Sequence, residues 1–252
     1  MKTLKETWIL FLHYEKLLLR NPFWLLAALF QPICYLYLFA PLLKNVMGAQ
    51  QGGVSSINSF TPGLLVMVSL FGVMFVGYSM IDYLRAGVIE RLRVTTASRL
   101  SLLLGLVLRD VLTLLVQAEI VIVLALPLGL TISAFGMLLT ALMMVLIGLF
   151  MSPISYALAL TVKSEDALGP ILNFFSQPML LLSGVLLPLT LAPLWLKNVS
   201  SFNPLKYVVD ASRAIFNGDI ANAAVWHGFL ILGVLVVLSF WWSLSCMRKA
   251  TE

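Results

Sequence analysis

The chain has 252 residues, of which 61% are hydrophobic and only 11% are charged, and its formal net charge is +5. Soluble domains carry roughly 25% charged residues, so this composition excludes a soluble globular protein and indicates an integral membrane protein. The basic residues lie at the ends of apolar segments and in one loop, which favours membrane topology over nucleic-acid binding as their cause. Weak alternation of apolar and polar residues argues against a β-barrel.

The apolar residues form runs of about 20 residues, each long enough to cross a hydrocarbon core of about 30 Å as a helix. A helix also satisfies its own backbone polar groups, as a segment inside a membrane must. We therefore predict an all-α polytopic membrane protein that forms one transmembrane domain over residues 1–252. Six transmembrane helices are predicted, at about 22–43, 60–81, 102–130, 137–162, 168–187 and 226–246.

Residues 1–21 precede the first predicted span and mix apolar and charged positions at helical spacing. This pattern predicts an amphipathic helix that lies along the cytoplasmic membrane interface. Trp8 supports the prediction because indole rings favour the headgroup level of a bilayer.

The loop between the second and third predicted spans concentrates the charge of the chain. It holds four arginines, at positions 85, 91, 93 and 99, against Glu90, a bias that places a loop on the cytoplasmic side. Arg248 and Lys249 after the last span predict a cytoplasmic C-terminus in the same way, so both termini of this multi-pass cell-membrane protein are expected inside. The loop either fixes topology alone or forms a helix at about 84–97 on which a cytoplasmic partner acts.

The third predicted span contains Arg109, Asp110 and Glu119. We expect the first two at the cytoplasmic boundary, which leaves Glu119 as the deepest, buried ionisable residue. An ionisable group in a span costs about 2.5–3.5 kcal/mol on insertion scales, so it faces protein or water. Glu119 is interpreted as a proton relay, as a group buried against another helix or as a residue near the interface.

The region before the last span is too long for one crossing. From Ala167 the chain is apolar for about 30 residues, but two prolines interrupt the run. We predict one crossing that ends near position 187 and then a re-entrant outer helical hairpin at about 188–218. Asn203 and Pro204 predict the start of its second helix, because Asn is a preferred N-cap and Pro is favoured at the first helical position.

Sequence motifs of catalysis are missing. No Walker-type phosphate loop, His-Glu-x-x-His metal motif or nucleophile elbow occurs in the sequence. His13 and His227 lie at opposite ends of the chain, and the two cysteines show no metal-ligand spacing. We therefore expect no enzyme activity, metal or cofactor in this chain, so an ion gradient or another subunit must supply any energy.

Two segments resemble motifs of the type-2 family of ABC exporter permeases, as in daunorubicin-type drug exporters and nodulation-factor exporters. The first is similar to the family's coupling segment Glu-x-Leu-x-x-Thr-Pro, with Thr96 in place of the proline, and reads Glu90-Arg91-Leu92-Arg93-Val94-Thr95-Thr96. The second is similar to the family's outer signature and consists of Ser183-Gly184-Val185, Pro188, Trp195 and Asn203-Pro204-Leu205-x-Tyr207-x-x-Asp210-x-x-Arg213. The resemblance covers nearly the whole chain, and the departure at Thr96 leaves the docking geometry of the first segment open.

The resemblance implies a permease subunit that forms a homodimer or heterodimer and binds separate ATP-binding cassette subunits, which carry ATP and Mg²⁺. Residues implied to couple to the nucleotide-binding subunit are Gly87, Glu90, Arg91, Leu92, Arg93 and Thr95. Candidates for the lining of a translocation pathway along spans one and five are Tyr35, Tyr37, Asn173, Phe174 and Gln177. The outer signature comprises Asn203, Pro204, Tyr207, Asp210 and Arg213.

The pathway candidates are aromatic or amide side chains without strong charge, which favours export of a lipophilic small molecule, drug or lipid-like. Aromatic rings also stack on sugars, so export of a polysaccharide or lipid-linked glycan stays open. Two other classes are a proton-coupled secondary transporter that uses Glu119 and a non-transporting membrane scaffold. Transport that depends on ATP and a soluble partner indicates the exporter, whereas transport that depends on the proton gradient indicates the secondary transporter. A scaffold would show no partner-dependent ATPase activity.

Overall fold

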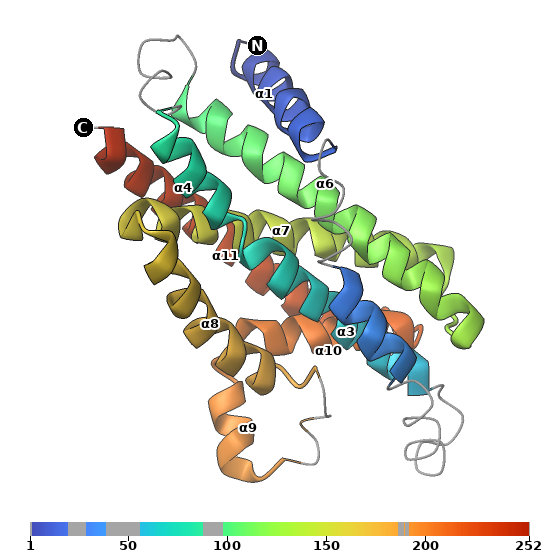
Figure 1. The fold of residues 1–252 in the computed structure, drawn as a ribbon. Coiled ribbons are helices and arrows are strands. Elements are labelled where there is room, and N and C mark those ends of the chain that lie inside the picture. Colours follow the sequence, from blue (N-terminus) through green and yellow to red (C-terminus); the bar gives the residue numbers. More distant parts are fainter. Residues whose placement is uncertain are drawn as a thin grey trace.

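The computed structural model describes residues 2–19, 29–38, 56–87, 98–185, 189 and 192–251. Within these ranges the regular structure is helical and contains no strand. Figure 1 shows the labelled helices, which are α1 (Lys2–Leu19), α3 (Ser56–Met74), α4 (Gly77–Arg85), α6 (Arg99–Ala125), α7 (Ala134–Val162), α8 (Glu165–Leu182), α9 (Leu194–Ser200), α10 (Pro204–Phe216) and α11 (Ala223–Thr251). A short 3-10 helix, Leu126–Leu128, follows α6, and an apolar helical segment covers Leu29–Leu38.

Four helices of the described residues are long and apolar enough to cross a membrane: Ile57–Arg85, Leu100–Leu128, Ala134–Val162 and Ala223–Lys249. They overlap the second, third, fourth and sixth predicted spans. The fifth predicted span coincides with α8, whose first turn is acidic and which contains two prolines. Only the helix Leu29–Leu38 is described for the first predicted span, so the total of six crossings stays a prediction.

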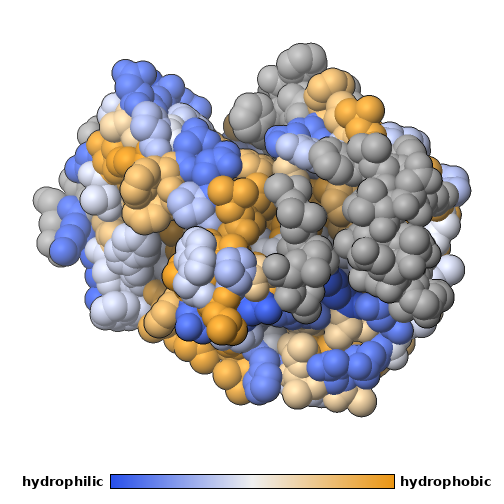
Figure 2. Space-filling model, turned by 90° about the horizontal axis from the view of Figure 1, so that it is seen from below, coloured by the Kyte–Doolittle hydropathy of each residue, from blue (hydrophilic) through white to orange (hydrophobic). Residues whose placement is uncertain are grey.

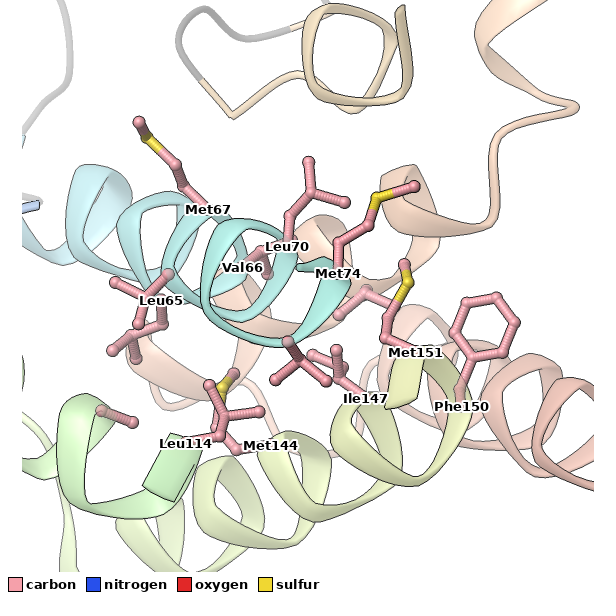
Figure 3. Close-up of a cluster of buried hydrophobic side chains, with 14 of the residues drawn as sticks. Leu65, Val66, Met67, Leu70, Met74, Leu114, Met144, Ile147, Phe150 and Met151 are labelled. Carbon is pink, nitrogen blue, oxygen red and sulfur yellow. The ribbon is translucent and has the colours of Figure 1, made fainter. Parts of the chain in front are cut away.

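Helix α7 packs against α3, α4, α6 and α11 and so forms the centre of the bundle. Its apolar side chains meet those of α3 and α6 in a dry core (Figure 3). Gly148 lets α6 come close, because a Cβ at this position would lie 2.8 Å from Cγ2 of Val111. Small residues of this kind allow membrane helices to pack through close backbone approach.

Helix α1 lies along α6 and is amphipathic. Phe11 and Tyr14 are buried on one face, whereas Trp8 and Ile9 are 58% and 66% exposed on the other. Burial raises the pKa of Tyr14 to about 12, so its hydroxyl keeps its proton at neutral pH. An exposed apolar face with Trp is typical of a helix at a membrane interface, and this location of α1 stays a prediction.

The second span has a break between α3 and α4. At the turn Phe75–Val76 the helical hydrogen-bond ladder is interrupted, and α7 supplies the missing partners. Ser155 Oγ donates to the Met74 carbonyl oxygen over 2.5 Å and accepts the Gly77 N–H over 2.8 Å. A Cβ on Gly77 would lie 2.7 Å from the Ser155 carbonyl oxygen, so only glycine fits this joint.

Asn58 fastens the other end of the same span. Its Nδ2 donates to the Thr131 carbonyl oxygen over 3.0 Å and to the Phe216 carbonyl oxygen over 3.2 Å. Its Oδ1 accepts the Thr131 N–H over 3.0 Å. One carboxamide therefore joins the first turn of α3, the loop before α7 and the end of α10.

The segment between α8 and α11 forms two short helices, α9 and α10. Asn203 is the N-cap of α10, since its Oδ1 accepts the Leu205 N–H over 3.0 Å, and Pro204 is the first helical residue, as predicted. The buried face of α10 packs against α3, α7 and α11. Seen from this end, the described surface mixes hydrophobic with hydrophilic residues (Figure 2).

Candidate functional site

The predicted coupling segment is described only at its beginning. Helix α4 ends at Arg85, and Gly87 follows with a φ of 66°, a left-handed conformation that suits glycine after a helix end. The other residues of the prediction lie outside the described residues, and so does the Thr96 departure; these are Glu90, Arg91, Leu92, Arg93 and Thr95.

Two contacts join α4 to the start of α8. Arg85 at the end of α4 forms an ion pair with Glu165 in the first turn of α8. The second contact lies further along both helices. Gly169, one turn after Glu165, lies against Tyr78, whose hydroxyl oxygen would be 2.5 Å from a Cβ on that glycine. These contacts therefore connect α4 directly to α8.

Three of the predicted pathway residues share the exposed face of α8. Asn173, Phe174 and Gln177 are exposed, and Phe174 is 73% accessible. Their spacing of three to four residues places them on one side of the helix. Leu181, one further turn along, is 66% exposed and extends this face.

An apolar groove continues this face toward α9 and α10. It encloses about 430 Å³ between Phe174, Pro178, Met179, Val199 and Phe202. Phe202 is 90% exposed in the single chain. In a membrane protein an exposed apolar surface of this kind contacts lipid, a second subunit or a ligand.

The other two pathway candidates lie on a separate helix. Tyr37 is 43% exposed, and Tyr35 is half-buried, on the segment Leu29–Leu38. The five candidates are thus divided between two helices, and the structure brings together only those of α8.

The outer signature residues hold the end of α8 to α10. Asn203 caps α10 through Oδ1, and its Nδ2 donates to the Met179 carbonyl oxygen of α8 over 2.6 Å. The Tyr207 hydroxyl donates to the Ser201 carbonyl oxygen over 3.0 Å, which fixes the turn between α9 and α10. The signature thus has a structural role in this chain.

Arg213 adds a second connection from α10. Its Nη2 donates to the Gly184 carbonyl oxygen over 2.7 Å, just after α8, and its Nε donates to the Ser59 carbonyl oxygen over 3.1 Å in α3. Asp210, half-buried one turn earlier, contributes a charge opposite to that of Arg213. Three chain segments therefore converge on one guanidinium.

A buried charge cluster lies between α6 and α7. Arg109 Nε and Nη2 donate to Asp110 Oδ1 over 3.0 and 2.7 Å. The Tyr156 hydroxyl donates to Asp110 Oδ2 over 2.5 Å and accepts from Arg109 Nη2 over 3.1 Å. Ser152 Oγ donates to the same Oδ2 over 3.0 Å, so every oxygen of the carboxylate is bonded.

This cluster corrects the expectation for the third span. Arg109 and Asp110 are only 7% and 3% exposed, and Tyr156 is fully buried, whereas Glu119 is only partly buried. The buried ionisable groups are therefore the Arg109–Asp110 pair rather than Glu119. The Arg-Asp dipeptide within an apolar run was the sequence signal for a buried ion pair. Its hydrogen-bond partners, Ser152 and Tyr156, lie more than 40 positions later in the sequence.

The chemistry of the described residues is that of packing and binding. In the ranges that the structure covers, no three His, Cys, Asp or Glu side chains come together as a metal-ligand set. The pair Arg109–Asp110 is neutral overall and hydrogen-bonded, as a buried ion pair must be.

Comparisons with known proteins agree with the sequence resemblance. Residues 5–217 match the family described as ABC-2 type transporter. The "Putative transport permease ycf38" of Porphyra purpurea is 27% identical over 201 residues, which cover 79% of this chain and 69% of that protein. Its namesake in Pyropia yezoensis is 25% identical over 228 residues, or 87% of this chain and 78% of that protein.

A bacterial relative is longer than this chain. The "Probable multidrug ABC transporter permease YbhR" of Escherichia coli (strain K12) is 25% identical over 182 residues, which are 69% of this chain and 48% of that protein. The match to the ABC-2 type transporter family spans well over half of the chain. The chain therefore belongs to the ABC-2 type transporter family and is a membrane-spanning transport permease.

Proposed function

We propose that this permease exports a lipophilic small molecule across the cytoplasmic membrane, driven by ATP hydrolysis on a separate ATP-binding subunit. The observation that carries the proposal is the exposed apolar face of α8, with Phe174 73% accessible and a groove of about 430 Å³ beside it. Its lining is aromatic and aliphatic, which suits a lipophilic cargo. The same face supports a homodimer or heterodimer, in which a second permease covers it.

The proposed power stroke begins at the cytoplasmic loop. Two nucleotide-binding subunits close on ATP and Mg²⁺ and press on the helix predicted at 84–97, where Glu90 and Arg91 form the contact. Because Gly87 directly follows α4, the force reaches α4 first and bends it at the Phe75–Val76 joint.

Helix α8 then follows α4. The Arg85–Glu165 ion pair and the Tyr78–Gly169 contact connect the two helices at two levels. Tilting α8 changes the groove between α8 and α9 and opens a pathway at the dimer interface toward the outside. With the predicted coupling helix on the cytoplasmic side of the membrane, both termini also lie in the cytoplasm.

Reconstitution with the ATP-binding subunit tests the energy source. We expect dye efflux from proteoliposomes to require ATP and the ATP-binding subunit. The Glu90→Ala/Arg91→Ala variant should lose this efflux, because the contact with the ATP-binding subunit is lost. Efflux that survives removal of ATP but collapses with the proton gradient would favour a secondary transporter instead.

A pair of phenylalanines tests the pathway. Phe174→Ser should lower efflux of a lipophilic dye severalfold, because it places a hydroxyl in the groove. The matched control is Phe135→Ser at the start of α7, which removes a phenylalanine that is 55% exposed and does not line the groove. Equal loss in both variants would contradict the assignment of the α8 face.

A further inference from the structure

A second cavity of about 280 Å³ lies where α3, α4 and α6 meet, away from the groove of α8. We propose that it is a binding site for a monovalent lipophilic organic cation. Binding is independent of the export mechanism, and only the step from bound cation to exported cargo rests on the proposed function. The residues that carry the argument are Phe75, Tyr78, Asp82, Arg109, Asp110 and Gln117.

The described lining residues of the cavity carry one net negative charge. Arg109 is already bonded to Asp110 and Tyr156, so this pair contributes no net charge. Asp82 also lines the cavity, and no described residue forms a hydrogen bond or ion pair with its carboxylate. One uncompensated carboxylate beside a low-dielectric wall attracts a cation and repels an anion.

Gln117 supplies a buried polar group that faces the cavity without a partner. Its side chain is 3% exposed, and within the part of the chain that the structure describes its carboxamide has no hydrogen bond. Gly72 leaves room for it, because a Cβ there would lie 2.7 Å from Gln117 Oε1. A ligand in the cavity would meet this carboxamide by hydrogen bonding or by charge–dipole contact.

Aromatic rings form one wall. Phe75 and Tyr78 are nearly parallel, with ring centroids 6.3 Å apart and planes at 6°. Phe71 extends the row, at 6.5 Å and 10° from Phe75. The faces of aromatic rings attract cations, and organic cations with apolar substituents gain both this attraction and apolar contact.

Together these features select the ligand class. A metal ion would need several ligating groups, and in the described ranges no three acidic, His or Cys side chains converge. A neutral apolar molecule would gain nothing from the Asp82 carboxylate or from the Gln117 carboxamide. A lipophilic cation satisfies the carboxylate, the amide oxygen and the rings at once.

Two ions of equal shape and opposite charge test the proposal. The full chain in lipid nanodiscs is titrated with tetraphenylphosphonium and with tetraphenylborate. We expect saturable binding of the phosphonium and at least about tenfold weaker binding of the borate, a difference of about 1.4 kcal/mol. Equal binding of the two ions would overturn the proposal.

Variants locate the site. Asp82→Asn keeps the shape of an exposed side chain and should weaken phosphonium binding about tenfold. Gly72→Ala should also weaken it, because the added methyl displaces Gln117 into the cavity. The matched control is Asp166→Asn, which removes an exposed carboxylate that does not line the cavity and should leave the affinity unchanged. The same loss in Asp166→Asn, or none in Asp82→Asn, would contradict the site.

The two proposals fail separately. Charge-selective binding in a chain that shows no ATP-driven efflux supports the cation site and contradicts the proposed function. ATP-driven efflux in a chain without charge-selective binding overturns the cation site and leaves the proposed function intact.

Discussion

Arg85, the last residue of α4, forms an ion pair with Glu165 in the first turn of α8. The side chains are 61% and 36% exposed, so solvent screens their attraction, and the pair contributes about 0–1 kcal/mol to stability. Its importance lies in its position. It connects the helix that leads into the predicted coupling segment with the helix that carries the candidate pathway.

Charge reversal tests this connection. We expect Arg85→Glu and Glu165→Arg each to reduce partner-stimulated ATPase activity and efflux severalfold, and the double reversal to restore both, because the pair is re-formed with opposite polarity. Thermal stability should change by less than about 1 kcal/mol.

Asp166→Arg is the control for this reversal, since it alters the same turn of α8 but not the pair. Absence of recovery in the double variant would contradict a role of the ion pair in coupling.

The Arg109–Asp110–Tyr156 cluster predicts large effects on stability. Asp110→Asn leaves the Arg109 charge buried without compensation and should cost about 3–5 kcal/mol. Tyr156→Phe removes one hydroxyl between two charged groups and should cost about 1–2 kcal/mol, at the upper end for hydrogen bonds between membrane helices.

Thermal unfolding of the detergent-solubilised protein measures both changes. Thr161→Val, which removes an exposed α7 hydroxyl that donates to Ala157 of its own helix and lies 3.8 Å from Cys246 Sγ, should be nearly neutral. If Asp110→Asn were equally neutral, the charges would not be buried as described.

The joint of the second span is sensitive to one methyl group. Gly77→Ala would place a Cβ 2.7 Å from the Ser155 carbonyl oxygen and should destabilise the protein by about 1–3 kcal/mol through overpacking. Gly233→Ala in α11 is the control, because nothing lies within 4 Å of the added Cβ there. This control should be neutral or stabilising by up to about 1 kcal/mol, since alanine favours a helix. Equal unfolding temperatures of the two variants would argue against close packing at the joint.

Glu15 of α1 gives the stability a pH dependence. Burial raises the pKa of its carboxyl, nearby Asp110 adds to the rise and Arg109 opposes it. The folded protein therefore holds the proton more tightly than the unfolded chain. The resulting stability is complete below the unfolded pKa of about 4.3 and is lost as the pH rises through the folded pKa.

Glu15→Gln removes this loss. The variant should gain unfolding temperature relative to the wild type at pH 8 but not at pH 4. Asp166→Asn, which removes an exposed carboxylate, should show no such difference between the two pH values. A gain of equal size at both pH values would show that the effect is not linked to protonation.

Long-range contacts decided which features the sequence could predict. The four long helices and the cap of α10 depend on apolar runs and on Asn203-Pro204, which are local signals. The charge cluster depends on partners in another helix, 42 to 47 positions away, so a local argument could not predict that Arg109 and Asp110 are buried together.

Proline does not mark the break in the second span. Pro62 and Pro153 lie inside helices that continue through them, whereas the second span breaks at the apolar pair Phe75–Val76. The break persists because Ser155 of α7 satisfies the freed backbone groups, which is a property of the neighbouring helix. The exposed position of Asn173, Phe174 and Gln177, by contrast, follows from their helical spacing alone.

The hydrogen bonds of Asn58 to Thr131 and Phe216 and the hydroxyl of Ser155 hold the two ends of the second span differently. The carboxamide locks three segments into one block, whereas the Ser155 hydroxyl can reorient by rotation about one bond. Between them α3 forms a rod of 19 residues. At a rise of 1.5 Å per residue this rod is about 28 Å long. In the proposed mechanism a push near Gly87 therefore bends the span at the Phe75–Val76 joint, and the block around Asn58 acts as the anchor against which the bend is made.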